Sequence, residues 1–92
     1  MKHVTVYHPN GNTNSKTLDE TRSDLSQLQQ FVNGYITMVP KSILLKEDVQ
    51  IFVNEDGIPM GLRPNNNPDL IERIGNLKLC GPVVIAENWK LK

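Results

Sequence analysis

Residues 2–8, KHVTVYH, alternate between apolar and polar side chains, which is the pattern of a half-buried β-strand. One face of this strand carries Val4 and Val6, and the other carries His3, Thr5 and Tyr7. Asn10-Gly11 then predicts a tight turn, because both residues tolerate positive φ. The polar segment TNSKTLDETR that follows is expected to return as an edge strand.

The segment SDLSQLQQFVNG predicts the one clear helix. Its apolar positions recur at spacings of three and four and form a single stripe: Leu25, Leu28, Phe31 and Val32. Either Ser23 or Asp24 can cap the start, and Gln27 would complete a capping box with Asp24. Gly34 is expected to end the helix in the left-handed conformation.

Three further segments predict strands. YITMVP is expected to form a strand that Pro40 ends, and LCGPVVIAE a closing strand. DVQIFVNEDGIPMG predicts a hairpin with Val49, Ile51 and Val53 on one face and Asp56-Gly57 at the reversal. RPNNNPDLIERIGN reads as a loop with a short helix over 69–74. We therefore expect residues 1–92 to form a single α+β domain, a small, mostly antiparallel sheet of four to six short strands with one α-helix packed on one face.

The sheet face opposite the helix is also expected to be apolar. We place Phe52 and Val84 there, together with either Tyr35 and Val39 or Ile36 and Met38. Such a face needs a cover, either from the chain's own loops or from another copy. With so little chain left for a cover, we expect a homo-oligomer.

Composition excludes several classes of protein. Ten basic residues balance ten acidic ones, and no basic stripe appears, so we expect no long nucleic acid as a partner. Cys80 is the one cysteine, which rules out an internal disulfide and favours a reducing compartment. Neither a signal peptide nor an apolar run of membrane-spanning length is apparent. We therefore expect a cytoplasmic protein that does not enter membranes.

No catalytic or metal-binding constellation stands out. His3 and His8 point to opposite faces if both lie on one strand, so they cannot chelate a metal together. Cys80 lacks a neighbouring base and is better explained as a small apolar filler. Asp69, Glu87 and Lys90 resemble a nuclease motif, but ENWK separates the last two by three positions rather than two. We expect neither an enzyme nor a cofactor.

The segment VNEDGIPMGLRPNNNPD holds the strongest candidates for binding. Its prolines stiffen the chain, and its asparagines and Arg63 offer donors and acceptors suited to phosphate or carboxylate. Alternatively, these residues simply favour turns, with Asn65 bonding its own backbone. Trp89, the sole tryptophan, either covers the edge of the core or anchors an interface or a ligand's ring.

The segments LQQFVNGYITMVP, VQIFVNEDGIPMGLRPN and LCGPVVIAE, in this order, resemble the domain-of-unknown-function family 3846 over roughly residues 22–87. Two features depart from its pattern: Asn33 stands where small residues are usual, and NNNPDLIERIGN has no counterpart in it. The matching positions are Leu25, Leu28, Val32, Gly34, Tyr35, Asn54, Glu55, Gly57, Gly61, Leu62, Asn65, Gly81 and Pro82.

The resemblance implies a setting in bacteriophages and mobile elements, and it carries no activity or catalytic residue to this chain. Our first hypothesis is a phage-type counter-defence protein that sequesters a small ligand, such as a nucleotide immune signal, without catalysis. The second is a protein-interaction module that inhibits a host protein through an apolar sheet face, and the third is a small hydrolase of a signalling nucleotide. The candidate ligand-binding residues are Arg63, Asn65, Asn54, Glu55, Tyr35 and Trp89. In the first hypothesis, Arg63 and an aromatic side chain such as Phe52 line a pocket between subunits.

Overall fold

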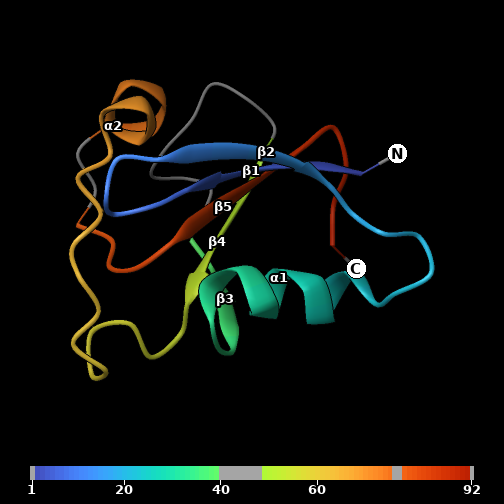
Figure 1. The fold of residues 1–92 in the computed structure, drawn as a ribbon, viewed down its shortest axis with the longest axis horizontal. Helices are drawn as coiled ribbons and strands as arrows, with labels where there is room; N and C mark the ends of the chain where they lie inside the picture. Colours follow the sequence, from blue (N-terminus) through green and yellow to red (C-terminus); the bar gives the residue numbers. More distant parts are fainter. Residues whose placement is uncertain (1, 40–48, 76–77, 92) are drawn as a thin grey trace.

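The structure, a computed structural model, describes residues 2–39, 49–75 and 78–91. One antiparallel sheet holds five strands: β1 (His3–Tyr7), β2 (Thr13–Thr17), β3 (Ile36–Met38), β4 (Gln50–Asn54) and β5 (Val83–Glu87). Their spatial order is β2-β1-β5-β4-β3. Helices α1 (Asp24–Val32) and α2 (Pro68–Ile74) lie on opposite sides of the sheet (Figure 1).

The predicted α+β class and the small antiparallel sheet are confirmed. The strand at the start of the chain, its turn at Gly11 (φ 96°), the polar edge strand and the closing strand all form as expected. The short helix expected within the loop is present as α2, so the described residues form two helices rather than one. Pro40, which was expected to end β3, lies outside the described residues.

Helix α1 begins at the cap that its sequence offered. Ser23 is the N-cap, and its side chain accepts a hydrogen bond from the backbone N–H of Ser26. Gln27 does not complete a capping box. Its buried amide instead donates to the carbonyl of Asp19 and accepts from the Asp19 N–H, at 2.9 and 2.8 Å. Gln27 therefore anchors the segment that leads into the helix.

The end of α1 differs from the prediction. Asn33 (φ 61°) adopts the left-handed conformation expected of Gly34, and its backbone N–H bonds back to the last turn. Asparagine is among the few residues that tolerate this region, because its short side chain fits there. The expectation that Gly34 is the left-handed residue was therefore wrong.

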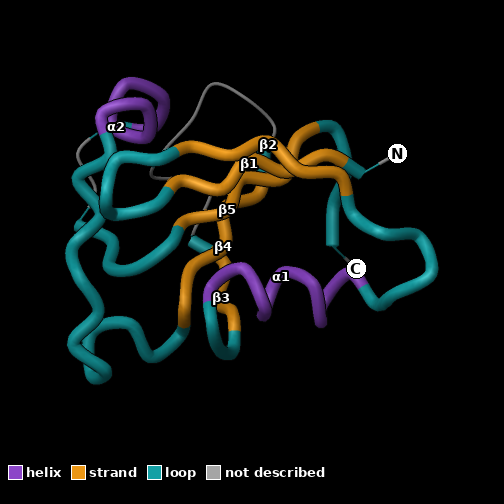
Figure 2. The backbone as a smooth tube through the Cα atoms, viewed as in Figure 1, coloured by secondary structure: helices purple, strands orange, loops and turns teal. Residues whose placement is uncertain are grey.

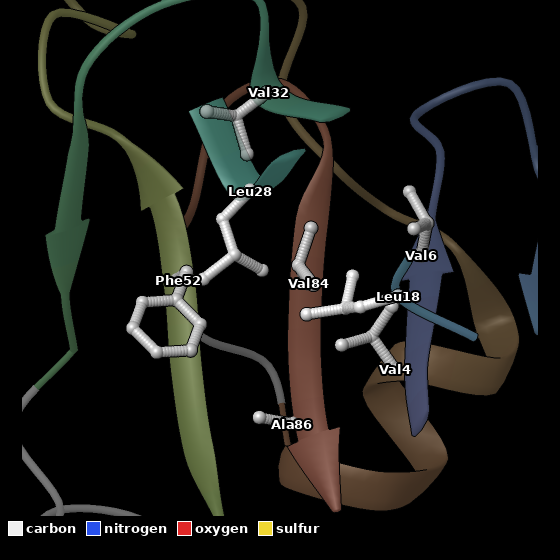
Figure 3. Packing of buried hydrophobic residues seen from close by; sticks show 8 residues of the cluster. All are labelled: Val4, Val6, Leu18, Leu28, Val32, Phe52, Val84 and Ala86. Atoms are coloured by element: carbon white, nitrogen blue, oxygen red, sulfur yellow. The ribbon is translucent and has the colours of Figure 1, made fainter. Parts of the chain in front are cut away.

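The first core cluster lies between α1 and the sheet. Leu28 and Val32 point from the helix toward Phe52 on β4 and Val84 on β5 (Figure 3). Val4 and Val6 of β1 extend the same face, as their alternation predicted. Phe52 and Val84 therefore lie on the helix face, and their assignment to the opposite face was wrong. The cause is that β4 and β5 are apolar on both faces, so their sequences do not mark the face that the helix covers.

The opposite face is apolar and packs against α2. Leu70 and Ile74 of the helix form a second cluster with side chains from the other side of the pleat. The sheet contributes Tyr7, Val49, Ile51, Val53, Val83 and Ile85, and Val39 packs at its border. Val49, Ile51 and Val53 share this face as predicted. The chain thus supplies a cover for the second face itself, and the homo-oligomer stays a prediction that needs another reason.

The predicted hairpin at Asp56-Gly57 does not form. Residues 55–61 make a series of turns after β4, and β4 pairs with β3 and β5 instead of with a returning strand. The turns are closed by local bonds, including Met60 N–H to the Asp56 carbonyl and Leu62 N–H to the Gly57 carbonyl, both 2.9 Å. Because β4 already has a neighbour on each side, no edge remains for residues 58–61.

Neither helix within the described residues has the length or the apolar run that crossing a bilayer requires.

Replacing Leu28 by alanine should destabilise the fold by about 2–5 kcal/mol, because Leu28 is fully buried between α1 and the sheet and its loss leaves a cavity. Leu25→Ala on the same helix is the matched control. Leu25 was expected in the same stripe but is 44% exposed, so its loss should change stability by only about 0.5 kcal/mol or slightly more. Urea denaturation of both variants measures the difference, and equal losses would contradict the described packing.

Candidate functional site

A shallow hollow of about 240 Å³ lies where β3 and β4 meet the turns of residues 55–61. Thr37 and Glu55 form one side, Ile58 and Pro59 another, and the segment 78–80 closes the third. Glu55 and Lys78 are exposed at the hollow and carry opposite charges. Figure 2 shows the long connection after β4 leaving the sheet at this end. The hollow is therefore built from three segments that are distant in sequence.

Asn54 fixes the floor of this hollow. Its side-chain amide is buried and donates to the carbonyl of Val32, at 2.9 Å, at the end of α1. Its Oδ1 atom accepts the backbone N–H of Asp56, at 2.8 Å, and so starts the first turn. A Cβ atom on Gly34 would lie 2.8 Å from the Asn54 Nδ2 atom. Glycine is thus needed at position 34 by the space that Asn54 occupies.

The wall formed by residues 57 and 80 depends on close backbone contact. A Cβ atom on Gly57 would lie 3.1 Å from the carbonyl oxygen of Cys80. Cys80 is half-buried, and its backbone forms an isolated bridge with Pro64. The turns after β4 are thereby held against the segment that leads into β5.

Asn65 and Asn67 join the proline-rich loop to the far end of β1. The Asn65 amide donates to the carbonyls of Tyr7 and Gly81, at 2.8 and 2.9 Å. The Asn67 amide donates to the carbonyls of His8 and Asn12, at 3.1 and 3.0 Å. The two Oδ1 atoms accept backbone N–H groups of the loop and of α2, where Asn67 is the N-cap. Both side chains are buried, and all their polar atoms bond the chain itself.

The six predicted ligand-binding residues do not form one site. Asn54, Glu55 and Tyr35 come together, since the Glu55 N–H donates to the Tyr35 carbonyl at 2.8 Å. Asn54 and Asn65, however, turn their amides inward, and the side-chain N and O atoms of both are hydrogen-bonded to the chain's own backbone. The buried asparagine side chains therefore hold the chain's own backbone in place, which was the alternative explanation for them.

Arg63 and Trp89 lie away from this group. Arg63 is exposed and does not line the hollow. Trp89 is half-buried beyond the opposite end of β5, where its Nε1–H donates to the His3 carbonyl at 2.8 Å and Lys2 Nζ lies 5.6 Å from the ring centroid. The indole therefore packs at the edge of the first core cluster.

Sequence reasoning named Tyr35 as a candidate and considered Met38 for an apolar sheet face, but it missed the exposed side chains of Ile58 and Met60. Five large hydrophobic residues of the described chain are exposed, and one of them is Leu25 on α1. The other four lie on β3, next to its start or on the turns after β4: Tyr35 (69%), Met38 (53%), Ile58 (77%) and Met60 (58%). Ile58 lines the hollow, whereas Met38 pairs with Phe52 and so points to the α1 face of the sheet, opposite to Thr37. We call these four side chains the β3 rim. The available signal was the segment IPMG, which places two large apolar residues inside a turn, where solvent-exposed positions are usually polar.

A second hollow, of about 270 Å³, lies by the loop before α1 and is acidic. Lys2 forms an ion pair with Asp24, and Asp19 and Glu20 also line it. Hydrogen bonds from the Thr21 side chain and backbone hold the pKa of Asp19 below its usual value. Among the described residues no group of three histidine, cysteine, aspartate or glutamate side chains is placed to hold a metal ion.

Arg73 ties α2 to the sheet. Its guanidinium donates to the Tyr7 hydroxyl, at 3.2 Å, and to the Glu87 carboxylate. Burial lowers the pKa of Arg73, but these hydrogen bonds outweigh that effect and raise it overall. The charge is therefore permanent and serves to dock the helix.

Replacing Asn65 by alanine should cost about 2–4 kcal/mol, because it leaves the buried Tyr7 and Gly81 carbonyls without their donor. Asn66→Ala is the matched control, since Asn66 is exposed and should change stability by less than about 0.5 kcal/mol. Urea denaturation measures both. If the two substitutions cost the same, the bracing role of Asn65 is refuted.

Gly34→Ala should destabilise the protein by about 1–3 kcal/mol through its clash with the Asn54 amide. The same substitution in an Asn54→Ala background should cost at least about 0.5 kcal/mol less, because the clashing group is gone. A double-mutant cycle by chemical denaturation tests this. A penalty that is unchanged in the second background would mean that backbone conformation, rather than space, requires glycine.

One of three comparisons with known proteins finds a match for this chain. No curated protein and no solved structure matches it. A family model described as "Domain of unknown function (DUF3846)" matches residues 1–90, which extends the resemblance seen over residues 22–87 to both ends of the chain. Strand β1, the turn at Gly11 and the segment NNNPDLIERIGN, which departs from the family's pattern, all fall within the match. The chain therefore belongs to the DUF3846 family.

Proposed function

We propose that this protein is a non-catalytic module that binds another protein through the β3 rim. The observation that carries the proposal is the position of Tyr35, Met38, Ile58 and Met60. They come from the β3 segment and the adjoining turns after β4, and Ile58 lines the hollow itself. Together they make up four of the five exposed large hydrophobic side chains of the described residues.

The chemistry of the β3 rim resembles that of a protein interface. Tyrosine and methionine are enriched at interfaces, where they bury large contact areas, and apolar patches beside polar groups mark interaction sites on soluble proteins. Exposed Glu55 and Lys78 at the hollow supply the polar border. The backbone beneath is held by Asn54 and Gly57, so the surface loses little entropy on binding.

The geometry gives weaker support to a small-ligand site. The hollow, at about 240 Å³, falls below the range of roughly 300–1,000 Å³ that is common for ligand pockets. The amides of Asn54 and Asn65 are already bonded, and Arg63 stands apart. Sequestration of a nucleotide signal therefore stays a prediction, and so does hydrolysis of one.

The setting of the proposal follows from the sequence. The resemblance to a family that implies a setting in bacteriophages favours a protein of the host cell as the partner. The single cysteine favours the host cytoplasm as the compartment. The proposed outcome is inhibition of that partner by occupation of its surface.

Affinity capture from lysate of the host cell tests this proposal. The natural protein should retain one stoichiometric partner, and Ile58→Glu should reduce capture at least about tenfold, because it places a charge in an apolar contact. Arg63→Glu is the control, since Arg63 is also exposed but lies outside the hollow, and it should leave capture unchanged.

Two results would contradict the proposal. One is equal capture by the natural protein and the Ile58→Glu variant. The other is a rise in melting temperature with millimolar nucleotide that Arg63→Glu abolishes, which would favour the ligand hypothesis instead.

A further inference from the structure

The outer edge of β3 carries backbone groups that face away from the sheet. On the inner side, the Val39 N–H donates to the Ile51 carbonyl, and the Tyr35 carbonyl accepts from Glu55. Because antiparallel pairing alternates along a strand, residues 35, 37 and 39 direct their backbone groups toward β4. Ile36 and Met38 direct theirs outward. In the described part of the chain, β3 is hydrogen-bonded only to β4 within the sheet.

The two edges of the sheet differ in composition. β2 reads TNSKT, with every side chain exposed and polar and with Lys16 among them, which is a common protection against pairing with other chains. Residues 35–39, which contain β3, read YITMV without a charge, and Pro40 follows directly after them. An unprotected edge of this kind is a template for an added strand.

The β3 edge is complementary to itself. If two copies pair antiparallel about Thr37, each Ile36 lies opposite Met38 of the other copy, and the two Thr37 side chains face one another. All the outward backbone groups of Ile36 and Met38 then find partners. No like charges meet across the pairing, and a chain with ten basic and ten acidic residues does not repel its copy.

We infer that two copies of this chain pair through β3 to form a two-fold dimer in which the two described five-stranded sheets become continuous, and that the dimer presents two copies of the hollow, each with its exposed Ile58, on one face. The second statement rests on the proposed function. A two-fold axis that relates antiparallel strands of one sheet is perpendicular to that sheet, so the same face of each copy lies on the same side.

The dimer therefore doubles the proposed binding surface. Tyr35 of each copy stands opposite Val39 of the other, so the two Tyr35 residues are offset by four positions, or roughly 13 Å, along the strand direction. A partner protein that covers the axis contacts both hollows. Interfaces built from such short strands are small, and stable ones bury more than about 1,000 Å², so we expect self-association that depends on concentration.

Sedimentation equilibrium of the natural protein tests the inference. Its mass should rise from 10.4 kDa at low concentration toward twice that value at high micromolar concentration. Met38→Pro removes an outward N–H and should weaken association at least about tenfold. Ser15→Pro is the matched control on the other edge, because the β1–β2 register directs the Ser15 N–H outward as well, and it should leave association unchanged.

Circular dichroism shows whether each proline variant is folded. If Met38→Pro is unfolded, Met38→Lys, which places a charge at the half-exposed edge, takes its place with the same expected loss of association. A natural protein that stays monomeric throughout, or that associates equally with and without the Met38 substitution, would overturn the inference.

The proposed binding function and the proposed dimer can be refuted independently of each other. Partner capture that Ile58→Glu abolishes, by a protein that is monomeric, would overturn the dimer and leave the binding function in place. A dimer that Met38→Pro dissociates, without any capture, would support the pairing and contradict the proposed function.

Discussion

Strands β4 and β5 are apolar on both faces, so the sheet needs a cover on each side, and the rest of the chain is arranged to supply the two covers. Helix α1 packs Leu28 and Val32 on one face, and α2 packs Leu70 and Ile74 on the other. Burial of this kind is the main favourable term in folding, at about 25 cal/mol per Å² of apolar surface. A chain of 92 residues cannot leave either face of its central strands in water and stay folded.

Helix α2, which covers the second face of the sheet, is held in place by hydrogen bonds from buried amide side chains rather than by its own length. α2 has only seven residues, too few to be stable alone, and Asn67 caps it while bonding the turn between β1 and β2. Asn65 fixes the preceding loop to the end of β1, and Arg73 bonds Tyr7 and Glu87 on the sheet. Each amide satisfies carbonyl groups that would otherwise be buried without a donor, which is costly. The polar residues of the loop are therefore part of the core's construction.

The same arrangement leaves the β3 end of the sheet as the place where apolar side chains meet solvent. The turns after β4 are pinned by Asn54 and Gly57 yet present Ile58 and Met60 outward. A rigid backbone with exposed apolar side chains is suited to binding a partner's surface, because the backbone loses little conformational entropy on binding. The buried polar groups are already hydrogen-bonded within the chain, whereas apolar side chains near β3 are exposed to solvent. This contrast supports recognition of proteins over recognition of small polar ligands.

Alternation and turn chemistry in the sequence were enough to predict β1, the Gly11 turn, the polar edge strand and α1, because each depends on contacts within a few residues. The candidate site was predicted less well. Asparagines in a loop predict polar contacts, but whether Asn65 faces a ligand or the Tyr7 carbonyl depends on a strand 58 residues away. The face of Phe52 and the absence of a hairpin at Gly57 were likewise decided by which strands flank β4. The sequence by itself determined most of the local elements and the family. Only the tertiary structure decided which polar groups form hydrogen bonds within the chain and which apolar side chains remain exposed to solvent, because both outcomes depend on contacts between distant segments.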